Sequence, residues 1–422
     1  MKKIIILISA FLVAAGITSA QSWQSKEAAA LLREDNTRAG NNTNSYEFDK
    51  IVDTPAPKGY KPVYISHYGR HGSRSNWGGA SYEYVISVME QAKAAGILTA
   101  SGDSLMNEAR RVLAGYDGMD GRLSQRGVRE HGLLAQRMYN RFPSVFKGAR
   151  KIRSVASTSQ RCIISMNAFT ISLAKQNTDL FFYLDTGDKL MKYISFPKGE
   201  KYEDGSIARR EHMFDGIAHD TVSVMKRLFT DPKAAYKFVH TADELMDAIG
   251  ATAEIAEDFD ILENVYRYLP FDFIYKKWAS GNNKLYMEHC NSVEYGKYIC
   301  PPAKPLVDDI VAKADECLAS GEYAADLRFG HDFPLLTFVS YLGLEGVGDK
   351  LSYDEVNDKW FGFRNICMAS NFQMIFYRNK TGNVLVKFLY NEKECLLRGL
   401  APVSGPYYDW NTVKSNLAGY LR

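Results

Sequence analysis

The amino-acid sequence predicts an α/β protein with a three-layer core, in which helices cover both faces of a mostly parallel sheet, and with an inserted, mainly helical cap. Strand-like and helix-like runs alternate along residues 21–187, as is typical of a parallel sheet covered by helices. Residues 188–319 show helical patterns without strand alternation, and strand-like runs return in residues 320–422. We therefore expect a core formed by residues 21–187 and 320–422, with the cap between them.

The first part of the core contains three expected strands and four expected helices after a polar segment. Residues 21–60 are polar and mixed, apart from a short helical stretch near their start. The expected strands are 61–69, 149–157 and 179–187, and the expected helices are 80–98, 104–116, 123–143 and 158–176. Ser124 is a good N-cap for the third helix, and Ser157 or Thr158 for the fourth.

The second part of the core begins with an expected strand at 325–332, which a helix at 334–344 follows. Two further strand-like runs, 371–379 and 383–397, are joined by the short stretch Lys-Thr-Gly. A glycine-containing connection of this length between two such runs predicts a hairpin of two long strands.

The first 20 residues, MKKIIILISAFLVAAGITSA, differ from the rest of the chain. Lys2 and Lys3 precede an apolar run from Ile4 to Ala15, and small residues lead to Ala20. This layout is typical of a secretory signal peptide, so we expect cleavage after Ala20 and a periplasmic or secreted protein. The apolar run is shorter than the roughly 20 residues of a membrane span, and no Cys follows it, so no membrane anchor is expected.

The charge balance argues against nucleic acid as a partner. The formal net charge of +3 becomes +1 once Lys2 and Lys3 are removed with the leader. A nearly neutral protein has no general electrostatic attraction for nucleic acid or for an anionic membrane. Anion binding must then come from a local cluster of basic residues.

The cysteines and histidines do not suggest a metal site. The six cysteines, an even number, permit disulfides in an exported protein, and their pairing stays open. Cys290 and Cys300 are close enough in sequence to close a small loop, whereas Cys162 lies in an apolar helical pattern typical of a buried thiol. The spacing matches no zinc pattern and most histidines are scattered, so we expect neither a metal nor another cofactor.

Polar side chains follow three of the expected strands at the point where each strand ends. Arg70, His71 and Arg74 follow the first strand, Arg161 follows the second, and the later strand ends in His331-Asp332. Ligands of α/β sheets bind beyond the carboxyl ends of the strands. We therefore expect these six side chains to converge on one site.

The residue types in this cluster suit phosphoryl transfer. Guanidinium groups present planar pairs of donors that match phosphate oxygens. A neutral imidazole such as His71 can attack phosphorus, and a carboxylic acid such as Asp332 can protonate the leaving oxygen. Because the reaction depends mainly on positioning and on charge stabilisation, arginines can serve it in place of a metal.

The motifs at these positions resemble those of a known family. "RHGSR" at 70–74 is similar to the R-H-G-x-R signature of the histidine acid phosphatase branch of the histidine phosphatase superfamily, and "GHD" at 330–332 resembles its second signature. "LSQRGVREHGLLAQRM" and "RSVASTSQRCIISMNAF" resemble two further segments of that branch. "SNFQMIFYRN" and "VLVKFLYNEKE" resemble the C-terminal strands of its multiple inositol polyphosphate phosphatase group, and the resemblance spans roughly residues 60–415.

The resemblance implies roles for the individual residues. His71 would become a phosphohistidine, and Asp332 would protonate the leaving group, without a metal. The residues that would hold the phosphate are Arg70, Arg74, Arg161 and His331. The implied substrate is a small-molecule phosphate ester, with inositol polyphosphates such as phytate as the leading class.

The sequence departs from the family pattern at two places. Asn76 stands where the family often has proline, two residues after the second arginine of the signature. The inositol polyphosphate group usually carries His-Ala-Glu, whereas this chain has His-Asp-Phe, which puts the carboxylate one position earlier, as in other acid phosphatases and phytases. The first departure concerns the rim of the pocket and the second concerns the substrate.

Simpler interpretations exist for several of these residues. The arginines can belong to a solvated basic loop, Arg161 can be a surface arginine of a helix, and Asp332 can be the N-cap of the helix that begins with "FPLL". We favour the catalytic interpretation because an apolar strand delivers the arginines and the histidine beside two glycines. We also expect possible substrate contacts from Asn76, Trp77, Lys151 and Arg153.

Other functions remain open beside an inositol polyphosphate phosphatase. The nearest alternative is a broad-specificity or sugar-phosphate acid phosphatase. A non-catalytic protein that binds phosphate esters would have the same cleft, but the expected catalytic residues are all present. A phosphotransferase or mutase shares the phosphohistidine step, and the expected export argues against it.

Overall fold

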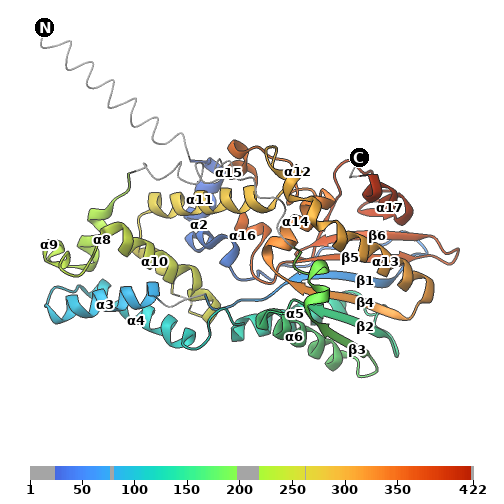
Figure 1. Cartoon of the computed structure of the whole chain (residues 1–422), viewed down its shortest axis with the longest axis horizontal. Helices are drawn as coiled ribbons and strands as arrows, with labels where there is room; N and C mark the ends of the chain where they lie inside the picture. Colours follow the sequence, from blue (N-terminus) through green and yellow to red (C-terminus); the bar gives the residue numbers. More distant parts are fainter. Residues whose placement is uncertain (1–23, 77–79, 197–217, 262, 420–422) are drawn as a thin grey trace, which may run out of the picture.

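The computed structural model describes residues 24–76, 80–196, 218–261 and 263–419 (Figure 1). The expected leader (residues 1–20) and Trp77 lie outside the described residues. Among the described helices, none is long and apolar enough to cross a lipid bilayer.

One eight-stranded sheet organises the core. Its strands follow the order β3-β2-β4-β1-β5-β6-β7, and β8 pairs with β6. The strands are β1 (Lys61–Arg70), β2 (Lys151–Ala156), β3 (Phe181–Thr186), β4 (Tyr323–Gly330), β5 (Asn371–Arg378), β6 (Val384–Tyr390), β7 (Lys393–Cys395) and β8 (Tyr407–Asp409). Strands β1 to β4 pair in parallel, and the strands from β5 onward pair antiparallel. This arrangement confirms the predicted mostly parallel sheet.

Helices cover both faces of the sheet, which confirms the predicted three layers (Figure 1). On one face lie α5 (Gln125–Arg141) and α6 (Gln160–Gln176), whose apolar side chains share a core with those of β2 and β4. On the other face lie α13 (Lys304–Ser320), α14 (Asp332–Leu342) and α17 (Trp410–Gly419), which share a core with β1, β5 and β6.

A third core belongs to helices alone, at the left of Figure 1. It is built from α2 (Lys26–Glu34), α3 (Ala80–Ala94), α4 (Ala100–Tyr116), α8 (Thr221–Leu228), α10 (Ala242–Ala256) and α11 (Phe271–His289), with Trp278 fully buried. These helices come from both sides of residue 187. The domain boundaries at residues 187 and 319 stay a prediction.

Short helical turns connect the longer elements. They are η1 (Asn36–Thr43), η2 (Asp188–Tyr193), α9 (Pro232–Ala235), η4 (Glu257–Phe259), η5 (Val265–Tyr268), α12 (Gly296–Ile299), η6 (Pro301–Ala303), η7 (Tyr353–Glu355), α15 (Val356–Lys359) and α16 (Gly362–Asn365). Two of them, η1 and α16, contact each other and lie beside the candidate site described below.

The predicted hairpin near the C-terminus is confirmed by the antiparallel pairing of β5 with β6, but its second strand is shorter than predicted. Residues 383–397 do not form one long strand, because the chain turns at Asn391 and Glu392 and β7 then folds back on β6. Both turn residues have positive φ, 45° and 64°, the combination that a tight two-residue hairpin turn requires. The turn was not predicted because the residues on both sides of it have a strand-like composition.

The first residues of two helices differ from the prediction, and the cysteines, whose pairing was left open, form no disulfide. The N-cap of α6 is Ser159, not Ser157 or Thr158, and the N-cap of α14 is His331, so that Asp332 is the first residue of that helix. All six cysteines are free thiols, and five of them are buried.

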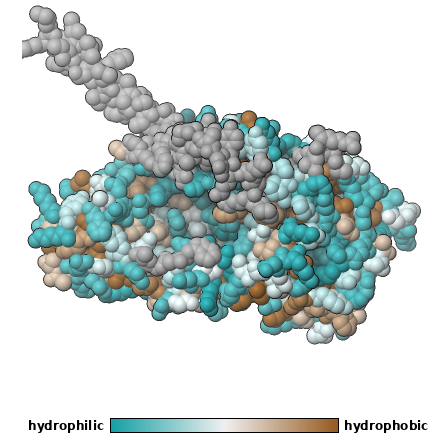
Figure 2. Space-filling view, in the orientation of Figure 1, coloured by the Kyte–Doolittle hydropathy of each residue, from teal (hydrophilic) through white to brown (hydrophobic). Residues whose placement is uncertain are grey.

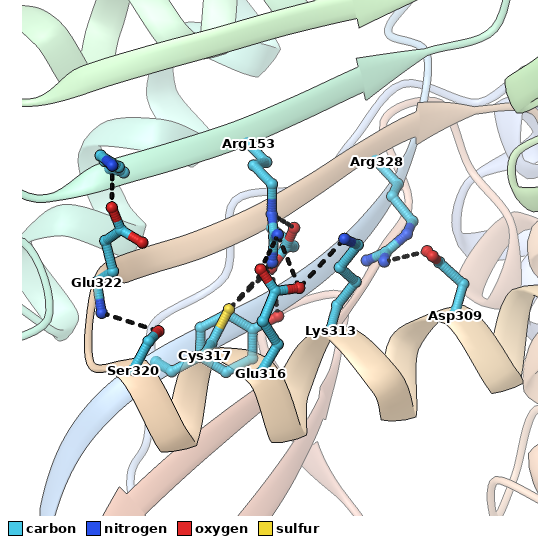
Figure 3. A network of polar contacts seen from close by, with 11 residues as sticks. Arg153, Asp309, Lys313, Glu316, Cys317, Ser320, Glu322 and Arg328 are labelled. Carbon is cyan, nitrogen blue, oxygen red and sulfur yellow. Dashed lines mark hydrogen bonds and ion pairs between the residues drawn. The ribbon is translucent and has the colours of Figure 1, made fainter.

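A network of ion pairs and hydrogen bonds links α13 to the sheet (Figure 3). Arg153 on β2 reaches Asp326 on β4 at 2.6 Å and Glu316 on α13 at 2.8 Å, and Arg328 on β4 reaches Asp309 on α13 at 2.6 Å. Burial alone would raise the pKa of Asp326, but the hydrogen bond from Arg153 and the positive charges of Arg328 and Arg153 lower it. The network therefore holds an internal carboxylate in its charged form.

Strand β3 forms one edge of the sheet and leaves apolar side chains in contact with solvent. Phe181 is 60% exposed and Leu184 is 47% exposed. The face of the molecule in Figure 2 is mostly hydrophilic, with hydrophobic side chains gathered at its lower right, where β3 lies in Figure 1.

Candidate active site

The carboxyl ends of the parallel strands lie level with one another. In the sheet register, Arg70 at the end of β1 pairs with Gly330 at the end of β4, and Phe329 pairs with Ala156 at the end of β2. The loops that follow therefore start from one edge of the sheet. This register brings together the arginines, histidines and aspartate, which lie up to 262 positions apart in the sequence.

Arg70 is fully buried at the end of β1 and is held in place from several directions. Its guanidinium donates to the backbone oxygens of Asn42 and of Ile366, the latter at 2.8 Å. The same guanidinium forms an ion pair with Asp332, with Nη2 2.9 Å from Oδ2. A buried arginine with this many fixed contacts loses little conformational freedom when it binds an anion.

His71 is buried and its tautomer follows from its hydrogen bond. Nδ1 lies 2.9 Å from the backbone oxygen of Gly72, and because a carbonyl oxygen only accepts, Nδ1 carries the proton. Nε2 then keeps its lone pair. Burial lowers the pKa of His71 well below its usual value, and the positive charges of Arg70, Arg161 and Arg74 lower it further. His71 is therefore a neutral imidazole with a nucleophilic nitrogen among guanidiniums.

His331 and Arg161 meet across the ends of β4 and α6. Arg161 Nη2 lies 3.2 Å from Nδ1 of His331, and Nε2 of His331 lies 2.9 Å from the hydroxyl oxygen of Ser157. A guanidinium only donates, so Nδ1 accepts and Nε2 carries the proton. Burial and the charge of Arg161 lower the pKa of His331 to about 4. Its ring centroid lies 5.6 Å from that of His71.

Asp332 is buried at the N-terminus of α14, where the helix dipole favours a negative charge. Its Oδ2 forms the ion pair with Arg70 and also accepts a hydrogen bond from Nδ2 of Asn42 at 2.8 Å. Burial alone would raise its pKa, but the charge of Arg70 and the hydrogen bond from Asn42 bring it down to about 2. Asp332 is therefore a carboxylate as long as the guanidiniums are not neutralised by an anion.

Arg74 completes the positive cluster. Burial and the neighbouring charge of Arg70 lower its pKa to about 10, so it stays protonated at neutral pH. Three guanidiniums face one carboxylate and two neutral imidazoles in this cluster. The excess of positive charge at the end of the sheet suits an anion with two negative charges, such as a phosphate ester.

The N-terminus of α5 holds the loop that carries these residues. The amide of Ser124 donates to the backbone oxygen of Ser73 at 2.9 Å, and its hydroxyl donates to the same oxygen at 3.1 Å. Glu130, buried six residues further along α5, accepts from the amide and the hydroxyl of Ser73, both at 2.7 Å. At Gly127 a Cβ atom would lie only 2.3 Å from the Ser73 oxygen, so the loop can rest here only on a glycine.

The comparison with protein families decides the identity of this fold and site. The family model described as the histidine phosphatase superfamily (branch 2) matches residues 69–391, which is more than half of the chain. The chain belongs to this family. Membership confirms the predicted phosphatase class, and this histidine phosphatase is a phosphomonoesterase.

Solved structures share the fold. The multiple inositol polyphosphate phosphatase of Bifidobacterium longum, in complex with inositol hexasulfate, is 18% identical over 90% of this chain and 97% of its own, with a TM-score of 0.69. The phytase from D. castellii is 13% identical over 91% of this chain and 85% of its own, also with a TM-score of 0.69. No curated protein matches the chain in sequence. At these identities the likeness establishes the fold alone.

Two residues that were expected to touch substrate, Lys151 and Arg153, form ion pairs elsewhere on β2. Lys151 lies at the amino end of β2 and pairs with Glu322, and Arg153 is engaged in the network under α13. These ion pairs lie away from the carboxyl end of β2, and the contact of these two residues with substrate stays a prediction. Asn76 lies two residues beyond Arg74, with its backbone oxygen accepting from Tyr116 and Gly121, and its contact with substrate stays a prediction.

Sequence reasoning missed three residues that contact the site. Asn42 binds both Arg70 and Asp332, Glu130 holds Ser73, and Ser157 holds the ring of His331. Glu130 left a signal, because it is an acidic residue on the buried face of an amphipathic helix. Asn42 left none, because it lies in a polar segment that is not strand-like or helix-like.

No group of three or more His, Cys, Asp or Glu side chains within the described ranges is arranged to hold a metal ion. The expectation that the reaction needs no metal stays a prediction. The roles of the six predicted site residues also stay predictions, and they are taken up next.

Proposed function

We propose that this histidine phosphatase hydrolyses phosphate monoesters through a phosphohistidine at His71. The observation that carries the proposal is the state of His71: a neutral imidazole with its proton on Nδ1, surrounded by three guanidiniums. A nucleophile needs the free lone pair on Nε2, and the phosphate that it attacks needs the positive charge of Arg70, Arg74 and Arg161.

In the proposed first step, the lone pair of His71 Nε2 attacks phosphorus and the bond from phosphorus to the ester oxygen breaks. Protonated Asp332 gives its proton to that oxygen, which leaves as an alcohol. In the second step, the Asp332 carboxylate takes a proton from water while the water oxygen attacks phosphorus and the bond from phosphorus to nitrogen breaks. This step restores neutral His71 and protonated Asp332 while inorganic phosphate is still bound, and Asp332 loses its proton to solvent when the phosphate leaves.

The charge balance of the site supports this role of Asp332. In the phosphate-free site the guanidinium of Arg70 helps to keep the pKa of Asp332 at about 2. A bound phosphate ester brings negative charge to that guanidinium and to Arg74, so the pKa of Asp332 rises when substrate binds. The proton thus becomes available at the stage at which the leaving oxygen needs it.

We propose inositol polyphosphates, phytate among them, as the leading substrate class. The B. longum enzyme, whose fold this chain shares, is a multiple inositol polyphosphate phosphatase seen with inositol hexasulfate, and the D. castellii enzyme is a phytase. The second candidate is a broader acid phosphatase. It is favoured by Asp332, which follows His331 directly, as in other acid phosphatases, instead of occupying the position of the glutamate in His-Ala-Glu.

One assay tests both levels of the proposal. Phosphate release by residues 21–422 is measured without added metal, with phytate and with an aryl phosphate, beside His71→Ala. We expect turnover of phytate and a loss of about 10⁴-fold or more in the variant. Turnover of the aryl ester alone would remove the inositol polyphosphate assignment, and an active His71→Ala would exclude the phosphohistidine.

We also propose that the protein is exported and that its leader is cleaved after Ala20. The proposal rests on the Lys-Lys start, the short apolar run and the small residues before the cleavage point. Sequencing the N-terminus of the protein from its native host should give Gln21 first. An N-terminus that still carries the apolar run would contradict it.

A further inference from the structure

Asn42 occupies an unusual position between two charged groups of the site. Its side-chain Nδ2 donates to Oδ2 of Asp332 at 2.8 Å, and its backbone oxygen accepts from the guanidinium of Arg70. One residue thus holds both members of the ion pair between Arg70 and Asp332. It does so across 290 positions of sequence, from the polar segment before β1.

The backbone that carries Asn42 is strained. Asn41, the preceding residue, has φ 51° and ψ −112° inside η1, a combination that non-glycine residues rarely adopt. Such conformations persist only where the surrounding structure enforces them, and they concentrate at functional sites. The strained backbone at Asn41 therefore suggests that the surrounding structure enforces this conformation and that the site depends on it.

The cause is a close fit between η1 and two glycines. Asn41 is buried, and its Nδ2 donates to the backbone oxygen of Trp278 on α11 at 3.3 Å. A Cβ atom on Gly362, at the start of α16, would lie 2.9 Å from Oδ1 of Asn41, and one on Gly281 of α11 would lie 3.2 Å from its Nδ2. The glycines leave the space in which Asn41 turns the chain toward Asp332.

We propose that Asn42 is a positioning residue of the reaction, which aims the carboxyl group of Asp332 and stabilises its ionised form between the two chemical steps. The inference rests on the proposed function, because it assigns to Asp332 the exchange of a proton with the leaving oxygen and with water. The amide donor of Asn42 favours the carboxylate, and Asp332 therefore releases its proton more readily. Asn42 itself gives and takes no proton.

Several other groups influence the same carboxyl group. Of these, Tyr68 and Arg70 lie on β1, Arg74 follows β1, Arg161 and Cys162 belong to α6, and His331 precedes Asp332. All of them lie outside the segment around Asn42 and are kept in a variant at this position. A change in the titration of Asp332 in such a variant therefore reports the lost amide donor.

The test compares Asn42→Ala and Asn42→Asp with Asn44→Ala. Asn44 lies in the same segment, but its amide donates to the backbone oxygen of Thr37 at 3.0 Å, so it is a matched control. The pH dependence of kcat/KM is measured with phytate, an alkyl phosphate, and with p-nitrophenyl phosphate, whose leaving group needs little protonation. Melting temperatures show whether each variant is folded.

We expect the alkaline limb of the phytate profile to move up by roughly one pH unit in Asn42→Ala, as the loss of one hydrogen bond to a charged group predicts. In Asn42→Asp the limb should move further, because two carboxyl groups then share Arg70. At the optimum, kcat/KM for phytate should fall about 10-fold or more, and much less for p-nitrophenyl phosphate. Asn44→Ala should match the wild type.

Three results would overturn the inference. One is an equal loss with both esters and no movement of the alkaline limb, which is what a merely structural role gives. Another is a further loss in kcat/KM when Asn42→Ala is added to Asp332→Asn, because the effect must pass through Asp332. The third is an Asn42→Ala profile identical to that of Asn44→Ala.

Gly362→Ala tests the same inference without changing Asn42. The added methyl group meets Oδ1 of Asn41 at 2.9 Å and should displace the turn, so that the alkaline limb moves in the same direction as in Asn42→Ala. An unchanged limb in a folded Gly362→Ala would count against the proposed route through Asn41. The wild type and His71→Ala are run in the same assay, so an active wild type with an inactive His71→Ala upholds the proposed function even where the role of Asn42 fails.

Discussion

The contact between Gly127 and the loop of His71 gives the most direct test of how the fold holds the site. In Gly127→Ala the new methyl carbon would lie 2.3 Å from the backbone oxygen of Ser73 and 2.7 Å from Cδ1 of Leu123. Ordinary contacts are near 3.5 Å, so the loop must retreat by roughly 1 Å. The hydrogen bonds from Ser124 to the Ser73 oxygen would then be stretched.

The expected magnitude follows from that displacement. A misplacement of about 1 Å near reacting groups costs on the order of 10²-fold in rate. Overpacking also lowers the free energy of unfolding by about 1–3 kcal/mol. We expect kcat/KM for phosphate release to fall by about 10²-fold in Gly127→Ala, measured together with a urea unfolding curve at the same pH.

A second glycine of α5 supplies the control. A Cβ atom on Gly132 would meet nothing within 4 Å, so Gly132→Ala should keep wild-type activity and gain up to about 1 kcal/mol in stability from helix propensity. The reasoning is refuted if Gly127→Ala is as active as Gly132→Ala while both are folded. The close approach would then not position the loop.

Three further variants separate chemistry from stability. Asp332→Asn should lower kcat/KM for an alkyl phosphate by about 10²-fold or more and for an aryl phosphate much less, and an equal loss with both esters would contradict its role as proton donor. Asp326→Asn removes the carboxylate that pairs with Arg153, so chemical unfolding should show about 3 kcal/mol less stability with unchanged KM; a changed KM would mean that the network under α13 reaches the site. His131 is buried and neutral, with a pKa lowered to about 3 from 6.5, so the unfolded chain binds the extra proton and stability falls as the pH drops below 6.5. In His131→Leu the unfolding free energy should depend less steeply on pH between 6.5 and about 3, by up to about 1.4 kcal/mol per pH unit, and an unchanged slope would show that His131 is protonated in the folded state.

The sheet and most of the site were predictable because local signals and the geometry of parallel sheets act together. Apolar runs marked β1, β2 and β4, and the rule that ligands bind at carboxyl ends predicted that the ends of β1 and β4 meet, where Arg70 pairs with Gly330 in the sheet. The motif around Ser124 and Gly127 was visible as a resemblance, but its physical meaning, a helix end that holds the Ser73 oxygen, needed the structure.

The parts that escaped prediction depend on conformations and contacts that no local pattern encodes. Asn42 reaches Asp332 from the residue after Asn41, which has a positive φ and packs against Gly362, more than 300 positions along the chain. The break between β6 and β7 depends on two adjacent residues with positive φ, of which one is a glutamate, an unusual turn residue. In each case tertiary packing overrode what the residue types alone favour.

The contacts that orient Arg70 determine how much of the chain must be present before the site can form. Its guanidinium depends on backbone oxygens supplied by residues 42 and 366, and β1 is flanked by β4 and β5, which are synthesised more than 250 residues later. A nascent chain that stops short of β5 thus contains His71, the proposed nucleophile, but lacks the strand and the backbone oxygen of Ile366 that orient Arg70 beside it. Such distant pairings form slowly, because loop closure must precede them. Phosphatase activity should consequently require the chain through β5, and products truncated before β5 should be inactive toward phosphate esters.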